Sequence, residues 1–169
     1  AGTSAVTSIG QYFSEMLDQS MTWKDAEKLC NEWGGHFALK GIMSVADAKR
    51  AVDIGCTGIM VSNHGGRQLD GSCAPFDQLS AIVDAVGDKI EVICEGGIQR
   101  GTHVLKALAC GAKACSGGRL YLFALAGCCQ LGVERALGSL RNEIERDMKL
   151  MGCRSISDLN RSHLRERRN

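Results

Sequence analysis

The sequence has few aromatic residues, almost no proline and no excess of charge of either sign. Only 5% of its 169 residues are aromatic and only one is proline. No proline-rich linker therefore marks a boundary between domains, and one structural unit over residues 1–169 is expected. Lysine and arginine number 20 against 19 acidic residues. A chain so close to neutral has no general field that draws it to nucleic acid or lipid, so neither is expected as a partner.

Long hydrophobic runs and paired cysteine motifs are also missing. No run reaches about 18 apolar residues, and no basic segment followed by an apolar one opens the sequence, so neither membrane spanning nor secretion is indicated. The nine cysteines form no CxxC pair and no Cys/His metal pattern, which predicts no metal site. Several lie in apolar runs, where a free thiol packs as a small hydrophobic residue. These features favour a reducing, cytoplasmic location, with peripheral association at the inner face of the membrane as a variant.

Short apolar runs alternate with helical patterns along the chain. Four runs predict buried strands, at residues 37–42, 57–62, 90–94 and 113–116. Apolar residues at helical spacing between them predict helices at 45–54, 76–86 and 102–109. This order is typical of a parallel α/β sheet. A helix over residues 23–33 is expected first, capped by Thr22 and ended by Gly34 and Gly35. A long amphipathic helix over residues 133–151 is expected last.

A weak internal repeat fits a repeated βα array. Gly41-Ile42, Ala51 and Gly55 recur as Gly97-Ile98, Ala107 and Gly111 at one constant offset, although chance matches among Gly and Ala remain an alternative. A closed eight-stranded βα barrel needs about 250 residues, so the strands predicted here supply only part of one. We expect Leu39, Ile59, Val61 and Ile93 to face the interior of such a barrel, which would leave apolar surface and two open sheet edges on this chain.

Polar and glycine residues follow all of the predicted strands at the end where parallel sheets carry their functional groups. His64 and Arg67 share a glycine-rich turn, where imidazole can accept a proton and guanidinium can hold a carboxylate, or where both can be structural loop contacts. Lys40 ends an apolar strand and needs an anionic partner unless it extends to solvent.

Two glycine turns indicate a phosphate site. Gly96-Gly97 and Gly117-Gly118-Arg119 each lie between a strand and a helix, where free backbone N–H groups meet the positive end of the helix. Glycines also serve simply as residues of tight turns. The nearby guanidinium groups of Arg100 and Arg119 favour the phosphate interpretation.

Several segments resemble one known family. Residues 39–42, the signature Ser62-Asn63-His64-Gly65-Gly66-Arg67-Gln68-Leu69-Asp70, residues 95–101 and Gly118-Arg119 are similar to the FMN-dependent L-2-hydroxy-acid dehydrogenases and oxidases, which include L-lactate dehydrogenase and glycolate oxidase. The resemblance runs from about Tyr12 to Leu164. It implies a TIM (β/α)8 barrel, of which this chain supplies about the last four βα units as a carboxy-terminal half.

The resemblance also implies a function and a set of roles. The cofactor is FMN, and the reaction is oxidation of an L-2-hydroxy acid, with L-lactate the first choice, to the 2-oxo acid. His64 is then the catalytic base, Arg67 binds the substrate carboxylate, and Lys40 stabilises negative charge on the reduced flavin. The other cofactor-binding residues are Ser62, Glu95, Gly96, Gly97, Gln99, Gly118 and Arg119, with Gly97, Gly118 and Arg119 at the phosphate.

Two residues depart from the family pattern. Glu95 stands where the family has Asp, and Gln99 stands where an Arg commonly contacts the phosphate. Gln99 can donate only a neutral hydrogen bond, and we expect Arg100 to substitute in part for the usual residue.

The family's amino-terminal half, which carries a substrate-binding Tyr and an Asp that orients the catalytic His, is absent from these residues. The expected partners are therefore a complementary amino-terminal half or further copies of the chain, besides the small 2-hydroxy acid. A flavin-dependent isomerase barrel shares the phosphate turns but not the His64 signature. A non-catalytic half-barrel that binds phosphate ligands or self-associates is the remaining alternative. The electron acceptor and the choice between hydride transfer and a carbanion stay open.

Overall fold

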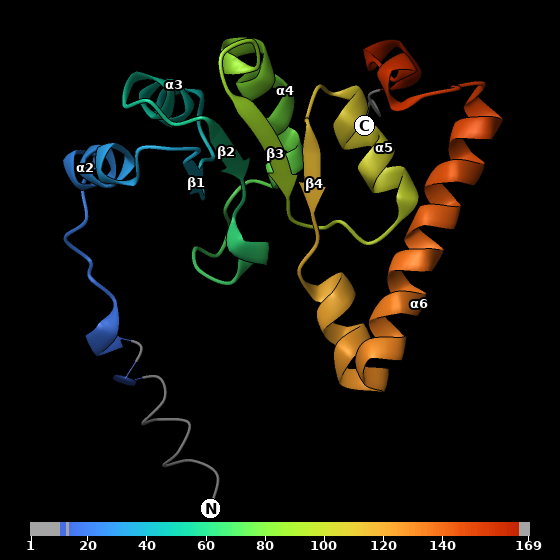
Figure 1. Cartoon of the computed structure of the whole chain (residues 1–169), viewed down its shortest axis with the longest axis horizontal. Coiled ribbons are helices and arrows are strands. Elements are labelled where there is room, and N and C mark those ends of the chain that lie inside the picture. Colours follow the sequence, from blue (N-terminus) through green and yellow to red (C-terminus); the bar gives the residue numbers. More distant parts are fainter. Residues whose placement is uncertain (1–10, 13, 166–169) are drawn as a thin grey trace, which may run out of the picture.

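The structure is a computed structural model that describes residues 11, 12 and 14–165. Its centre is a four-stranded sheet in the order β1-β2-β3-β4, and every neighbouring pair is parallel (Figure 1). The strands are Ala38–Lys40 (β1), Gly58–Val61 (β2), Glu91–Glu95 (β3) and Ala114–Ser116 (β4). They are joined by helices α3 (Val45–Asp53), α4 (Pro75–Val86) and α5 (Gly101–Ala109). The predicted alternation of strands and helices is confirmed, with bounds that differ by a few residues.

Helix α2 (Trp23–Trp33) precedes the sheet and has the predicted ends. The backbone N–H of Thr22 donates to the carboxylate of Asp25 at 2.7 Å, which completes a capping box. At the other end Gly34 has φ 64°, a left-handed conformation that glycine adopts without a steric penalty. Three short 3-10 helices, η1 (His64–Gly66), η2 (Ile156–Asp158) and η3 (Arg161–His163), lie in the connections and near the carboxy terminus.

The helices cover one face of the sheet, and the core lies beneath them. Ile59 and Val61 of β2 are fully buried there with Leu79 and Ile82 of α4. Leu39 is paired with Ile59 and therefore lies on the same face. The expectation that Leu39, Ile59 and Val61 face a barrel interior is wrong, because side chains alternate along a strand and these three point toward the helices.

The opposite face of the sheet carries the other set of side chains. Ile93 is paired with Met60, one residue out of step with Ile59, so of the four predicted interior residues it alone lies on this face. Lys40 is paired with Met60 as well. Glu95 and Ser116 are partners at the carboxyl ends of β3 and β4. The uncovered face is therefore more polar than the apolar runs of the sequence suggested.

Helix α6 (Arg119–Met151) is longer than predicted and is broken. Its backbone leaves helical geometry at Cys128 and Cys129, and the two legs fold back on one another, so that a Cβ on Gly132 would clash with the carbonyl oxygen of Ala124 (Figure 1). By length and composition, α6 is the one helix in the described part of the chain that is apolar enough to cross a membrane. The break divides that segment into a short apolar leg and a long leg that packs against α5.

Candidate active site

The loop after β2 is shaped by a serine and an asparagine. The backbone N–H of His64 donates to Ser62 Oγ at 3.0 Å, and that of Gly66 donates to Asn63 Oδ1 at 3.2 Å. Gly65 and Gly66 have φ values of 68° and 72°, and His64 itself has φ 56°. A non-glycine residue at positive φ is uncommon and occurs where surrounding contacts impose it. The loop therefore holds the His64 imidazole at the carboxyl edge of the sheet.

Lys40, Ser62 and Glu95 form one polar chain across three strand ends. Lys40 Nζ lies 3.0 Å from Ser62 Oγ and 3.3 Å from Glu95 Oε2. Ser62 Oγ donates a short hydrogen bond to the same Glu95 oxygen. Glu95 is buried, while the Lys40 side chain is half exposed. Lys40 thus has the anionic partner that its position required, and the partner is a carboxylate of this chain.

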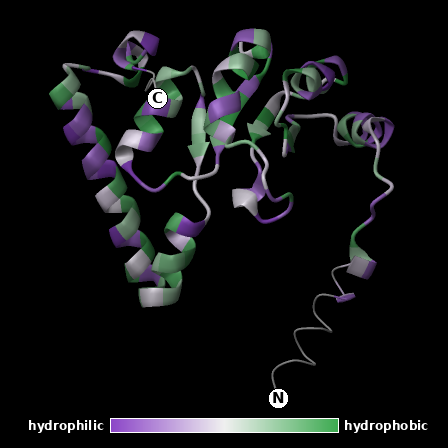
Figure 2. Ribbon diagram, turned by 180° about the vertical axis from the view of Figure 1, so that it is seen from behind, coloured by the Kyte–Doolittle hydropathy of each residue, from purple (hydrophilic) through white to green (hydrophobic). Residues whose placement is uncertain are grey.

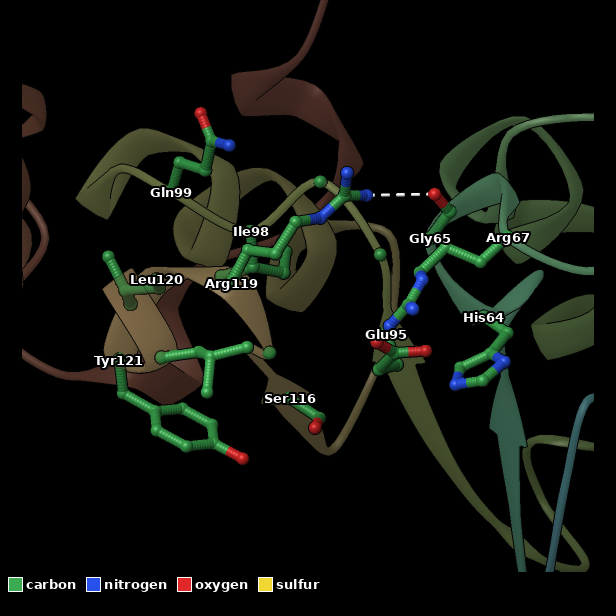
Figure 3. Close-up of a pocket in the computed structure, with 14 residues that line it drawn as sticks. His64, Gly65, Arg67, Glu95, Ile98, Gln99, Ser116, Arg119, Leu120 and Tyr121 are labelled. Atoms are coloured by element: carbon green, nitrogen blue, oxygen red, sulfur yellow. Dashed lines mark hydrogen bonds between the residues drawn. The ribbon is translucent and has the colours of Figure 1, made fainter. Parts of the chain in front are cut away.

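His64 and Arg67 enter a common cavity from the same loop. The cavity has a volume of about 150 Å³, and its lining includes both residues together with Glu95 and Arg119 (Figure 3). His64 Nδ1 lies 3.2 Å from Gln68 Nε2. Both His64 and Arg67 are exposed, which leaves the imidazole and the guanidinium open to a small ligand. The arrangement can place a proton acceptor beside a carboxylate-binding fork.

Two glycine turns form a cradle with room for a phosphate. A Cβ placed on Gly97 or Gly118 would meet no heavy atom within 4 Å, so the space beside both turns is open. Gly96 is closed on its other side, because a Cβ there would lie 2.9 Å from the ring of Pro75. Arg119 stands at the edge and donates to the carbonyl oxygen of Gly65 at 2.8 Å. Open backbone turns at a helix start with an adjacent guanidinium fit a phosphate group.

Arg100 does not take the place of the missing phosphate-contacting arginine. Its Nε lies 2.8 and 3.0 Å from the two carboxylate oxygens of Glu143 on α6, and Glu143 also accepts from the backbone N–H of Gly101 at 2.7 Å. The hydrogen bond to Glu143 raises the pKa of Arg100. The expected substitution is wrong because this guanidinium joins α5 to α6. Gln99 lines the cavity, and its amide points away from Glu95 and His64 (Figure 3).

All of the predicted site residues lie along two cavities that share His64. Lys40 and Ser62 line the second cavity, of about 550 Å³. The remaining residues line the first: Arg67, Glu95, Gly96, Gly97, Gln99, Gly118 and Arg119. The structure therefore brings together side chains from all four strand ends, as the parallel order predicted. Their individual roles stay predictions.

Three residues support the site without having been singled out from the sequence. Asn63 spans its loop, with Nδ2 donating to the Cys73 carbonyl at 3.2 Å. Gln68 contacts His64, as described above. His103 Nδ1 lies 3.0 Å from the Gly97 carbonyl and 3.2 Å from the Gln99 backbone nitrogen, so in either tautomer it makes one hydrogen bond to the glycine turn, as donor to Gly97 or as acceptor from Gln99. Asn63 and Gln68 lie within the signature over residues 62–70, and His103 lies in the first helical turn after Gly96-Gly97. These positions are the signals by which the sequence could have indicated them.

Comparison with known proteins identifies the family. The sequence model of the family described as "FMN-dependent dehydrogenase" matches residues 1–166. The chain belongs to the FMN-dependent dehydrogenase family. It is 50% identical over 148 residues to pre-mycofactocin synthase of Mycobacterium tuberculosis, a match that covers 88% of this chain and 37% of that protein. It is 46% identical over 153 residues to L-lactate oxidase of Nostoc sp., covering 90% of this chain and 42% of the relative.

Two solved structures are similar to this chain in backbone fold. Mandelate oxidase with benzoyl-formic acid is 45% identical with a TM-score of 0.79, over 83% of this chain and 42% of that one. A flavocytochrome b2 with sulfite bound is 40% identical with a TM-score of 0.83, over 91% of this chain and 42% of the other. The TIM-barrel fold class and FMN as the family cofactor are confirmed. The chain spans less than half the length of these relatives.

Proposed function

We propose that this chain carries the base, the substrate clamp and the phosphate site of an FMN-dependent enzyme that oxidises an L-2-hydroxy acid to the 2-oxo acid. The observation that supports this most directly is the convergence of His64, Arg67 and the Lys40–Ser62–Glu95 chain beside the open glycine cradle. Loops with a purely structural role would not be expected to place a proton acceptor, a guanidinium that can bind a carboxylate and a phosphate cradle at one edge of the sheet.

The cofactor would be held by the residues that fit it. Gly97, Gly118 and the guanidinium of Arg119 would hold the phosphate, and the Lys40 ammonium would stabilise negative charge on the reduced flavin. When bound, FMN supplies a two-electron acceptor. Glu95 reaches both Lys40 and Ser62, so it fixes the ammonium at the strand ends before any ligand arrives. Gln99→Arg introduces the positive charge that is usual at this position in the family. It should tighten FMN binding only if the side chain at position 99 turns into the glycine cradle.

Substrate binding and proton transfer are assigned to the loop after β2. Arg67 would bind the carboxylate through its planar fork. His64 would take the hydroxyl proton if the Cα hydrogen leaves as hydride, or the Cα proton if a carbanion forms. Nε2 can accept a proton only when the ring proton is on Nδ1. The atom of Gln68 that lies nearest Nδ1 is its amide nitrogen, a donor, so the Gln68 amide supports that tautomer only after it is turned to bring its carbonyl oxygen to Nδ1.

L-lactate is the substrate we propose within this class. Relatives named L-lactate oxidase and L-lactate dehydrogenase support it, with identities of 46% and 41%. Relatives named glycolate oxidase and (S)-2-hydroxy-acid oxidase, and the mandelate oxidase structures, support the wider class. We further propose that a complementary amino-terminal half completes the barrel, and that the nine free cysteines belong to a protein of the cytoplasm or of the inner face of its membrane.

The test uses this chain joined to an amino-terminal half from the same family, loaded with FMN and reduced by L-lactate without oxygen. His64→Gln should abolish flavin reduction while substrate affinity falls far less, because the amide cannot take the proton. Arg67→Lys should raise the Michaelis constant markedly, because one ammonium cannot reproduce a bidentate grip. Arg100→Lys is the matched control, because Arg100 pairs with Glu143 outside the site. It should leave the rate of flavin reduction and the Michaelis constant unchanged.

Near-normal reduction in the His64→Gln protein would show that the base is assigned wrongly. FMN binding without reduction by any 2-hydroxy acid in the unsubstituted protein would instead favour the non-catalytic alternative. That alternative rests on the open phosphate cradle alone.

A further inference from the structure

The break in α6 presents two adjacent cysteines. Cys128 and Cys129 are both exposed free thiols, and the backbone at this point leaves helical geometry. Cys128 has φ −152° and ψ 34°, while Cys129 has φ 46° and ψ −138°. In Figure 1 the break lies at the turn between the two legs of α6, away from the sheet. Both thiols therefore lie at the tip of a helical hairpin, outside the candidate active site.

Most other cysteines of this chain are shielded. Cys30, Cys56, Cys94, Cys110 and Cys153 are buried, Cys115 is half-buried, and Cys73 is exposed but has no neighbouring cysteine in the sequence. Burial raises the pKa of Cys56 and of Cys94 to about 11, and that of Cys115 to about 12. Thiolates are the reactive form, so these buried groups react slowly near neutral pH. Among the described residues, Cys128 and Cys129 are the one exposed pair joined through a single peptide bond.

We propose that Cys128 and Cys129 form a bidentate dithiol site for trivalent arsenicals. A trivalent arsenic centre of the type R–As=O binds two thiols: each sulfur loses its proton and bonds to arsenic, the arsenic–oxygen bonds break, and the oxygen leaves with both protons as water. Arsenic remains trivalent, so no oxidant or reductant is required. After the first sulfur binds, the second is tethered one residue away, and its effective concentration is on the order of millimolar.

The bidentate adduct is distinguished from binding to a single thiol by its resistance to competitors. A tethered second contact strengthens the complex by about 10²- to 10⁴-fold without any other change in the site. A monothiol such as glutathione should therefore remove arsenic slowly from the pair, whereas a dithiol such as 2,3-dimercaptopropanol should remove it readily. A single exposed cysteine such as Cys73 should lose it to either reagent.

The experiment treats the full chain with phenylarsine oxide under native conditions at neutral pH. Intact mass spectrometry should show one phenylarsenic group bound with loss of one water, and peptide mapping should place it on the segment that contains both cysteines. The adduct should survive glutathione and be lost to 2,3-dimercaptopropanol. Cys128→Ser and Cys129→Ser should each weaken retention against glutathione by about a hundredfold or more. Cys73→Ser is the matched control and should behave as the unsubstituted chain does.

Three results would overturn the proposal. One is the absence of any adduct on the native chain, another is removal by glutathione as easily as by the dithiol, and the third is undiminished retention in the Cys128→Ser/Cys129→Ser double variant. Circular dichroism of each variant accompanies the labelling, because exposed serines at these positions should leave the helix content unchanged.

Discussion

At the scale of single residues, Arg119 connects the two parts of the site. Its guanidinium donates to the Gly65 carbonyl and borders the glycine cradle. Gly65 has no side chain to obstruct this contact, since a Cβ there would lie 2.6 Å from Arg119 Nη2. One side chain thus spans from the glycine turn before α6 to the loop that carries His64.

Arg119→Ala should weaken FMN binding by about 1.5–3 kcal/mol, the usual contribution of a hydrogen bond to a charged group. Fluorescence titration with FMN of the chain joined to a family amino-terminal half measures the change. Arg100→Ala is the control, since Arg100 is paired with Glu143, and it should leave the affinity unaltered. If the two variants bind FMN equally well, Arg119 does not contact the phosphate.

Cys129 is the second residue whose backbone conformation invites a test. Its φ of 46° with ψ −138° is a combination that residues with a Cβ rarely adopt, and such a conformation costs on the order of 1–3 kcal/mol. Cys129→Gly removes this cost. It also raises the conformational entropy of the unfolded chain, which destabilises the folded state by about 0.5–1 kcal/mol, so a small net stabilisation is expected. Thermal unfolding of the chain joined to a family amino-terminal half measures it. Cys128 has a negative φ, so Cys128→Gly brings only the entropic cost and should lower the melting temperature. A higher melting temperature for Cys128→Gly than for Cys129→Gly would contradict this account.

At the scale of secondary structure, the pairing of Arg100 with Glu143 fixes the long leg of α6 against α5. Hydrogen bonds from Arg100 and from the Gly101 backbone hold the pKa of Glu143 below its ordinary value of 4.5. A carboxyl group with a lowered folded pKa stabilises the native state above its unfolded pKa and loses that contribution as the pH falls through the folded value. The contact between the two helices should therefore be sensitive to acid.

Glu143→Gln should lower the melting temperature at pH 7, and the difference from the unsubstituted chain should shrink as the pH falls below about 4.5. Thermal unfolding of the chain joined to a family amino-terminal half, followed by circular dichroism over a series of pH values, gives both curves. Glu145→Gln is the matched control, because Glu145 pairs with Arg141 within one exposed helical segment and should matter less. A difference that stays constant with pH would mean that the charge of Glu143 contributes nothing to stability.

At the scale of the whole molecule, the sheet is open at both sides. Within the described residues β1 pairs only with β2, and β4 pairs only with β3. Apolar side chains are also exposed on and just after the short leg of α6, where Figure 2 shows hydrophobic colouring: Tyr121, Leu122, Phe123, Leu125 and Leu131. Unpaired strand edges and contiguous apolar surface both favour association with another chain.

The isolated chain should therefore self-associate or aggregate rather than persist as a cooperative monomer. Size exclusion coupled to light scattering decides this, since a monodisperse monomer of 18.1 kDa with a sharp thermal transition would contradict it. Phe123→Glu should reduce association by placing charge on the exposed leg, while Leu150→Glu, an exposed leucine near the other end of α6, should not. Equal effects of the two variants would point to general solubility.

The sequence by itself determined the order of the elements and which residues lie together at the candidate site. Hydrophobic periodicity and glycine turns are local signals, and they were sufficient for the strands, the helices between them and the ends of α2. Because parallel strands place their carboxyl ends at one edge, the positions of His64, Arg67 and the glycine turns followed from that order. The resemblance to the family supplied the cofactor and the roles.

Only the tertiary structure decided which way side chains face and which distant groups meet. In the observed register of β1 and β2, Ile59 and Val61 face the helices. A shift of one residue would turn them to the other face, and an apolar run does not specify which of the two occurs. Arg100 was drawn to Glu143, 43 positions away in sequence, and Ser62 to Glu95, 33 positions away. A long-range polar pair depends on how helices and strands pack in space, because the chain between the partners carries no periodic signal of their contact. The break in α6 likewise carries no periodic signal in the sequence, and only the tertiary structure shows how closely its two legs approach each other.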